Sequence, residues 1–209
     1  IERKVGAGNT LYILTGDHGA MDLPEYLLSK NISSGRISGE QRKKIYAKII
    51  SQIDSKIGSK KVKQYGDAFY FDKDLTKDEK DIAVTIIKDL VLQIDGVERA
   101  LTAKEIIELP KSKINIRLKN MIHPTKSPNV FVLIKENWLW KVDYGSSHGT
   151  HYDYDSHVPF IVSRFNNIPR IVNKNLFTVD IPVTIANYLK LDYPNELDGI
   201  PIPLKFIEK

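Results

Sequence analysis

Residues 144–162 read YGSSHGTHYDYDSHVPFIV, a glycine-containing polar loop that runs into an apolar strand. Three of the five histidines of the chain, His148, His151 and His157, fall in this stretch beside two aspartates. Clustered imidazoles and carboxylates are typical of a metal site. The alternative is a polar loop that only leads into the strand expected at 158–163.

A second polar element, TGDHG at 15–19, follows the β-branched and aromatic run TLYILT at 10–15, which predicts a buried strand. In open α/β sheets, ligands bind where strands end. Asp17 and His18 therefore form a plausible half-shell for Zn²⁺ or a similar ion. The alternative is a turn in which Asp17 caps the next segment and His18 is incidental.

In the longer stretch, the best candidate ligand is His148, which lies between small residues that would let its imidazole reach an ion. Asp153 and Asp155 are expected to bond nearby backbone amides. His157 is expected to be packed, with one ring nitrogen satisfied. His123, which precedes a proline, is expected to be structural or exposed.

Residues 145–149 also match G-x-S-x-G, the pattern of a nucleophile elbow, with Ser147 in the nucleophile position. An elbow requires a helix directly after the serine and a later histidine as base. Here the following residues have no helical period, and the last histidine, His157, is too close to serve. The context argues against a serine hydrolase.

Strands and helices alternate along the chain, which predicts an α/β fold with a mostly parallel central sheet flanked by helices. Residues 59–143 have a strand–helix rhythm of their own and are expected to form a small inserted α+β cap. Residues 1–58 and 144–209 would then form the core. The expected helices are at 40–57, 78–94, 103–109, 112–121 and from Thr178 to about 189.

The composition excludes several classes of protein. Hydrophobic residues make up 42% and charged residues 27% of the chain, as in globular proteins. Without cysteine, disulfides and thiolate metal sites are ruled out. The net charge of +5 is spread over predicted helix faces without interleaved aromatics, so no nucleic-acid partner is expected. No apolar run reaches membrane-spanning length, so no membrane span is expected in this chain.

Three motifs in series resemble the alkaline-phosphatase superfamily: TGDHG, then SSHGTHYDYDSHVPFIV, then TVDIPVTIANYLKLDYPNELDGIPIP at 178–203. They are most similar to its type I phosphodiesterase/nucleotide pyrophosphatase-like branch, which includes alkaline phosphatases with a threonine nucleophile. The resemblance implies an alkaline-phosphatase-like fold and hydrolysis of phosphate monoesters or diesters by a two-zinc, in-line mechanism. By position in the motifs, Asp17 and His18 would bind the zinc ion that holds the nucleophile. His148 would bind the zinc ion that stabilises the leaving oxygen.

The resemblance is partial, because the family's nucleophile, first aspartate ligand and second metal pair precede its D-H-G element. Thr10 and Thr15 do not match the nucleophile motif. The chain is therefore expected to be the C-terminal portion of such an enzyme, inactive alone, with the N-terminal part as its partner. Residue 151 is often proline in the family, and His151 is expected at the surface. Relatives imply a periplasmic or extracellular location. A non-catalytic domain that kept the fold is the alternative.

Overall fold

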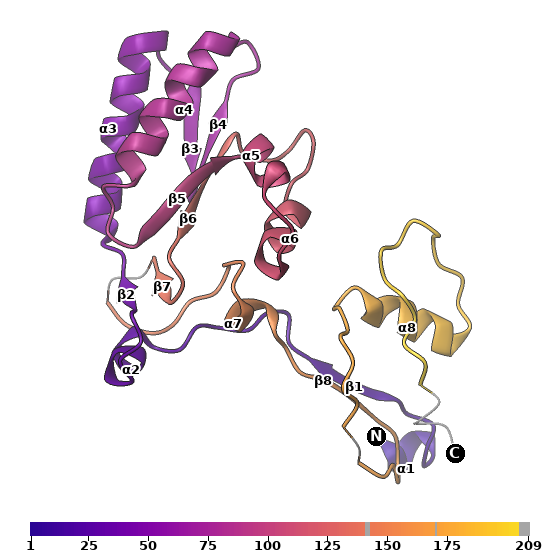
Figure 1. The fold of residues 1–209 in the computed structure, drawn as a ribbon. Helices are drawn as coiled ribbons and strands as arrows, with labels where there is room; N and C mark the ends of the chain where they lie inside the picture. Colours follow the sequence, from indigo (N-terminus) through magenta and orange to yellow (C-terminus); the bar gives the residue numbers. More distant parts are fainter. Residues whose placement is uncertain (141–142, 170, 205–209) are drawn as a thin grey trace. The chain divides into compact units, whose positions relative to one another are not determined.

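The computed structural model describes residues 1–140, 143–169 and 171–204. Contacts divide the chain into two compact units. One consists of Ile1–Asp17 with Val158–Lys209, and the other is His18–His157. The helices and strands of both units are labelled in Figure 1.

The His18–His157 unit is built around a four-stranded sheet in the order β3-β4-β6-β5. Its elements in chain order are α2 (Pro24–Ser29), β2 (Gly35–Arg36), α3 (Gly39–Ile57), β3 (Val62–Tyr65), β4 (Ala68–Phe71), α4 (Lys77–Val91), β5 (Val97–Thr102), α5 (Ala103–Glu108), α6 (Lys113–Asn120), β6 (Val130–Ile134), β7 (Trp138–Leu139) and α7 (Asp153–Ser156). The four helices expected within 40–121 are thus present, with bounds that differ by three residues or fewer.

Strand direction differs from the sequence prediction. The ladders of the four-stranded sheet are all antiparallel. Only the short pair of β2 with β7 is parallel among the described residues. The expectation of a mostly parallel sheet is wrong for the described part of the chain. β3 and β4 are joined by two residues, Gly66 and Asp67, and so short a connection permits only antiparallel pairing.

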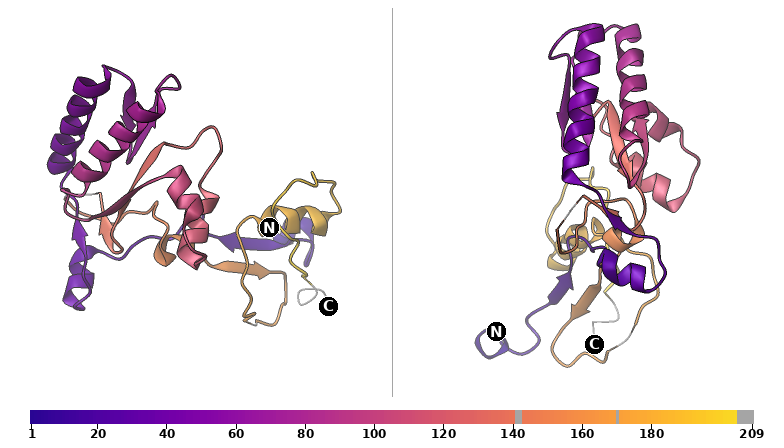
Figure 2. Two further views of the ribbon diagram at one scale, coloured as in Figure 1. Left: turned by 45° about the horizontal axis from the view of Figure 1, so that its top comes forward. Right: turned by 90° about the vertical axis from the view of Figure 1, so that its left-hand side faces the viewer.

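Helices cover both faces of this sheet. α3 and α4 pack side by side against one face (Figure 2), burying Ile49 and Ile53 of α3 and Ile87 of α4 against Phe69 and Val132. α5 and α6 cover part of the other face, where Ile106 and Leu118 meet Leu133. Alternate residues of β6 therefore enter two different clusters, as the period of a strand requires.

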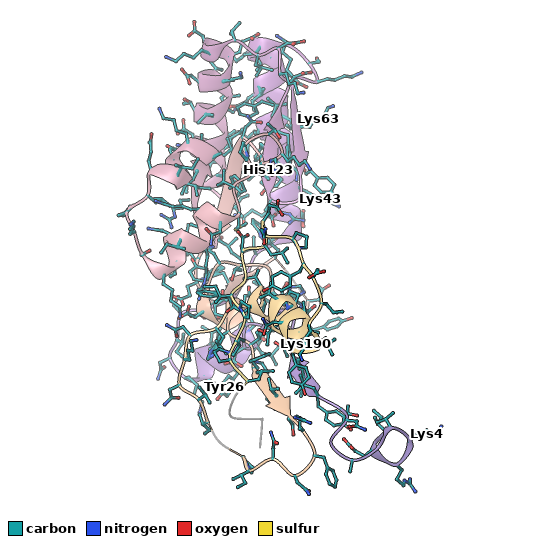
Figure 3. All side chains as sticks on the ribbon, turned by 90° about the vertical axis from the view of Figure 1, so that its right-hand side faces the viewer. Lys4, Tyr26, Lys43, Lys63, His123 and Lys190 are labelled. Atoms are coloured by element: carbon teal, nitrogen blue, oxygen red, sulfur yellow. The ribbon has the colours of Figure 1, made fainter. Side chains whose placement is uncertain are left out.

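Lysines on the outer surface of this unit are exposed. Lys43 projects from α3 and Lys63 from β3 (Figure 3), and both side chains lie in the solvent. These residues belong to the solvated faces that the sequence indicates. Among the described residues, no helix is both long and apolar enough to cross a bilayer.

The second unit contains α1 (Glu2–Val5), β1 (Tyr12–Thr15), β8 (Phe160–Ser163) and α8 (Asp180–Leu189). β1 pairs antiparallel with β8, with Leu14 opposite Ile161. The strand expected to be buried is instead open to solvent in this chain, because Leu14 is 62% and Ile161 53% exposed. Within the described residues, β8 is the one strand that pairs with β1.

The units divide the chain at other positions than the sequence predicts. α3 packs on α4 and on β3, which places it with the 59–143 block and not with the expected core segment 1–58. That the block is a cap inserted in a phosphatase core stays a prediction.

Candidate metal centre

The segment that carries His18 is bound to the segment that follows the histidine-rich loop. The Gly19 amide donates a hydrogen bond of 2.8 Å to the carbonyl of Asp155. A Cβ atom on Gly19 would lie 2.0 Å from the carbonyl oxygen of Tyr154, so only glycine permits this approach. The glycine of the D-H-G element thus fixes where the backbone beside His18 runs.

A second set of bonds joins the same segment to the residues before His148. The Met21 amide donates to the carbonyl of Ser147 at 3.2 Å, and the Ser146 hydroxyl donates to the carbonyl of Met21. The two sequence motifs, far apart along the chain, are therefore adjacent in the His18–His157 unit.

This arrangement brings two of the three predicted ligands together. The rings of His18 and His148 stack with centroids 3.5 Å apart and planes 10° apart. Nδ1 of His18 lies 2.7 Å from the carbonyl oxygen of Gly19. In the neutral tautomer that donates this bond, the lone pair is on Nε2, which is the arrangement typical of metal-bound histidine. Asp17 precedes His18 at the end of the other unit, and its role as a ligand stays a prediction.

The donors fit zinc in type, because imidazole nitrogen and carboxylate oxygen are both zinc ligands. They do not make a complete coordination shell. Among the described residues, no group of three or more histidine, cysteine, aspartate or glutamate side chains is arranged to hold a metal ion. The described chain supplies two adjacent imidazoles, and a four-ligand site would need further donors.

The loop that carries His148 is held in shape by Asp155. One carboxylate oxygen, Oδ2, accepts bonds of 2.6 Å from both the amide and the hydroxyl of Thr150. The expectation that Asp155 bonds a nearby amide is confirmed. Asp153 behaves differently from the expectation, since it pairs with Arg117 at 2.7 Å and Lys113 at 3.1 Å. Arg117, followed by Lys113, lowers the pKa of Asp153.

Tyr152 fastens the loop to the sheet. Its hydroxyl lies 2.9 Å from both Oε2 of Glu98 and the carbonyl oxygen of Ile134. Burial, together with the bond to Glu98, raises the pKa of Tyr152. Arg36 holds the start of the loop, donating from Nη1 to the carbonyl of Gly145 at 2.9 Å.

The remaining histidines differ in environment. His151, expected at the surface, is buried with 7% exposure, and its Nε2 has no hydrogen-bond partner among the described residues. Burial, followed by the charge of Arg99, lowers the pKa of His151. His157, expected to be packed, is exposed. His123 is exposed on the loop after α6 (Figure 3), where its Nδ1 accepts the Thr125 amide.

Ser147 lacks the setting of a nucleophile elbow. Residues 144–152 contain no helix, and the next helix is the four-residue α7. The Ser147 hydroxyl donates a long bond of 3.5 Å to the carbonyl of His148. This geometry agrees with the argument against a serine hydrolase.

A cavity of about 280 Å³ adjoins His148 within the same unit. The sequence did not predict this cavity, because the residues that line it are spread along the chain from Met21 to Tyr154. Most of the other side chains that line it are apolar, among them Met21, Leu118, Met121, Phe131, Leu133, Trp138 and Trp140.

Comparison with known proteins supports the resemblance. The chain is 26% identical over 205 residues to alkaline phosphatase PhoV of Synechococcus elongatus, and 25% identical over 209 residues to alkaline phosphatase PafA of Elizabethkingia meningoseptica. It is also 25% identical over 207 residues to a protein of Myroides odoratus named calcium-transporting ATPase. These matches cover 93–97% of this chain but 36–38% of the relatives.

The structural comparison agrees. The crystal structure of wild-type alkaline phosphatase PafA matches with a TM-score of 0.77 and 23% identity, over 96% of this chain and 39% of that one. A PafA variant with four substitutions matches equally well. A scan against models of known protein families gave no match. The chain thus spans a little over a third of the length of the proteins it resembles.

Proposed function

Because the chain belongs to the alkaline-phosphatase superfamily and has an alkaline-phosphatase-like α/β fold in part, we propose that its protein hydrolyses phosphate monoesters or diesters at a two-zinc centre. The observation that carries this proposal is the stacking of His18 on His148, from two loops that are hydrogen-bonded to each other. Two imidazoles from distant motifs lie side by side, and the resemblance assigns both of them as metal ligands.

In this proposal, His18 and Asp17 serve the nucleophile's zinc ion, and His148 serves the leaving group's. When bound, zinc acts as a Lewis acid on the phosphoryl group and its departing oxygen. The residues of this chain orient the ligands. The Gly19 carbonyl fixes the tautomer of His18, while Asp155 and Tyr152 fix the loop that presents His148. Such supporting bonds are what make a metal site rigid.

The nucleophile and the remaining metal ligands would come from the N-terminal part of the same protein, the partner of this chain. Two observations support such a partner: the chain spans 36–38% of its curated relatives, and paired strands expose Leu14 and Ile161. Covering these side chains would remove apolar surface from water. The superfamily resemblance further suggests a periplasmic or extracellular location.

The test compares the 209-residue chain with the whole protein. Zinc content would be measured by elemental analysis, and hydrolysis of 4-nitrophenyl phosphate and bis(4-nitrophenyl) phosphate with and without a chelator. We expect the whole protein to contain zinc and to lose activity with the chelator. The chain alone should bind zinc weakly and show no turnover.

Two results would contradict these expectations. Chelator-sensitive hydrolysis by the chain alone would show that it contains its own nucleophile. A whole protein without zinc and without hydrolysis would overturn the proposed enzyme and leave a non-catalytic domain that kept the fold.

A further inference from the structure

The cavity beside His148 has two unlike walls. The first consists of Ser147, His148, Gly149, Thr150 and His151 of the histidine-rich loop. The second comes from the sheet and α6, and from residues 138–140, which carry both tryptophans of the chain. The polar side of the cavity thus includes His148, a proposed metal ligand, and most of the remaining lining is apolar.

The apolar wall is rigidly held. The indole of Trp138 packs between two glycines, where a Cβ atom on Gly96 would lie 2.2 Å, and one on Gly35 2.7 Å, from ring carbons. Lys135 lies over the Trp138 ring at 5.5 Å, and the Arg42 guanidinium over the Trp140 ring at 5.0 Å. Rings fixed in this way form a pocket before any ligand arrives, which lowers the cost of binding.

Some of the polar groups in the lining already have partners within the protein. Asp67 is the one carboxylate among the described lining residues, and it pairs with Arg42 at 3.0 Å. Thr150 donates its hydroxyl to Asp155. His151, by contrast, is 7% exposed and its Nε2 has no partner in the described chain. A buried polar atom without a protein partner needs an explanation, and a bound ligand or water is one.

We propose that this cavity receives the alcohol part of the phosphate ester and selects flat, apolar groups, aromatic ones above all, over polyols. This inference rests on the proposed function, in which His148 serves the metal ion at the leaving oxygen. The carbon attached to that oxygen must extend away from the phosphorus, and the cavity adjoins His148.

Size and polarity both support an aromatic group. A cavity of about 150 Å³ lined by apolar side chains binds benzene, so 280 Å³ holds one ring or two fused rings. A sugar or glycerol would bring several hydroxyl groups against mostly apolar side chains, and unpaired hydroxyls disfavour binding. A single polar substituent could instead meet the imidazole of His151, whose pKa is lowered because burial disfavours the charged form.

The test uses binding without turnover, on the 209-residue chain. Trp138 and Trp140 are its two tryptophans, so its two indole N–H resonances both report on this cavity. Phenol and glycerol would each be titrated into the ¹⁵N-labelled chain. We expect phenol to shift the indole resonances saturably and glycerol to leave them unchanged. If the indole resonances of the unmodified chain respond equally to phenol and glycerol, or do not respond to phenol, the inference is overturned.

A matched pair of variants locates the binding. Ala68→Leu adds three carbons to a lining residue, whereas Ala47→Leu makes the same change on the exposed surface of α3. Ala68→Leu should weaken phenol binding about tenfold or more, and Ala47→Leu should not. Equal effects, or no effect of either, would show that phenol binds elsewhere and would overturn the inference.

Activity of the whole protein separates this inference from the proposed function. The expected result is a higher kcat/KM for phenyl phosphate than for glycerol phosphate, reduced by Ala68→Leu selectively for phenyl phosphate. Phenol binding without any hydrolysis would support the cavity and refute the enzyme. Hydrolysis without phenol binding would support the enzyme and overturn the inference about the cavity.

Discussion

The imidazole rings of His18 and His148 lie face to face, with 3.5 Å between their centroids. They belong to segments separated by more than a hundred residues, and backbone bonds from Gly19 to Asp155 and from Met21 to Ser147 hold these segments together. The pairing is therefore a product of the fold of the His18–His157 unit and not of local sequence.

Removal of either ring should weaken zinc binding. If both imidazoles are ligands, His18→Ala and His148→Ala should each lower the zinc affinity of the whole protein by more than the roughly 10–100-fold that loss of a supporting residue costs. Titration calorimetry with zinc would measure this. His123→Ala, which removes an exposed imidazole from another loop, is the control. Unchanged zinc affinity in His148→Ala would exclude His148 as a ligand.

Gly19 should not tolerate a side chain. In Gly19→Ala the new Cβ would meet the Tyr154 carbonyl at 2.0 Å, so the His18 segment must move away. We expect the free energy of unfolding to fall by about 1–3 kcal/mol, as for other overpacked sites, and zinc affinity to fall with it. Urea denaturation would measure the free energy of unfolding. Ala20→Ser, at the exposed neighbour, should change neither, and a fully stable Gly19→Ala protein would refute the close approach.

Local features of this fold could be read from the sequence. The capping box of Thr102 with Glu105 forms as expected, because its partners are three residues apart. The i, i+4 pattern of isoleucines likewise predicts α3 to within one residue. Both signals depend on neighbours along one helix, so tertiary structure does not alter them.

Strand direction could not be read in the same way, because side chains alternate identically in parallel and antiparallel strands. Gly66 and Asp67, the two-residue connection of β3 and β4, were the signal that could have corrected it. His151 was misplaced for another reason. Its burial depends on the loop being tied to the sheet through Tyr152 and Glu98, residues 54 positions apart.

The loop attachment at Tyr152 should contribute measurably to stability. Tyr152→Phe removes the buried hydroxyl that lies 2.9 Å from both Glu98 Oε2 and the carbonyl oxygen of Ile134, and with it the hydrogen bond that this hydroxyl donates. The expected loss is about 1–3 kcal/mol in the free energy of unfolding, measured by urea denaturation. Tyr144→Phe is the matched control, since Tyr144 is 81% exposed. Equal stability of the two variants would show that the Tyr152 hydroxyl does not hold the loop.

Acid should weaken the other attachment of the loop, through Arg36. Arg36 donates from Nε and Nη2 to Glu25 while its Nη1 bonds the Gly145 carbonyl, and the bond from Arg36 lowers the pKa of Glu25 from 4.5 to about 2. Because the folded pKa lies below the unfolded value, the stabilisation is complete above pH 4.5 and is lost as the pH falls through about 2.

Carbon-detected NMR titration of the Glu25 carboxyl group would measure this pKa directly. Glu25→Gln should make the unfolding free energy less sensitive to pH between 4.5 and about 2. At pH 7 the Glu25→Gln protein should be less stable than the parent. Glu40→Gln, an exposed glutamate in the first turn of α3, should keep the parent's pH dependence. A Glu25 midpoint near 4.5 in the folded protein would mean that Arg36 does not pair with it, and that the loop start at Gly145 is held by other contacts.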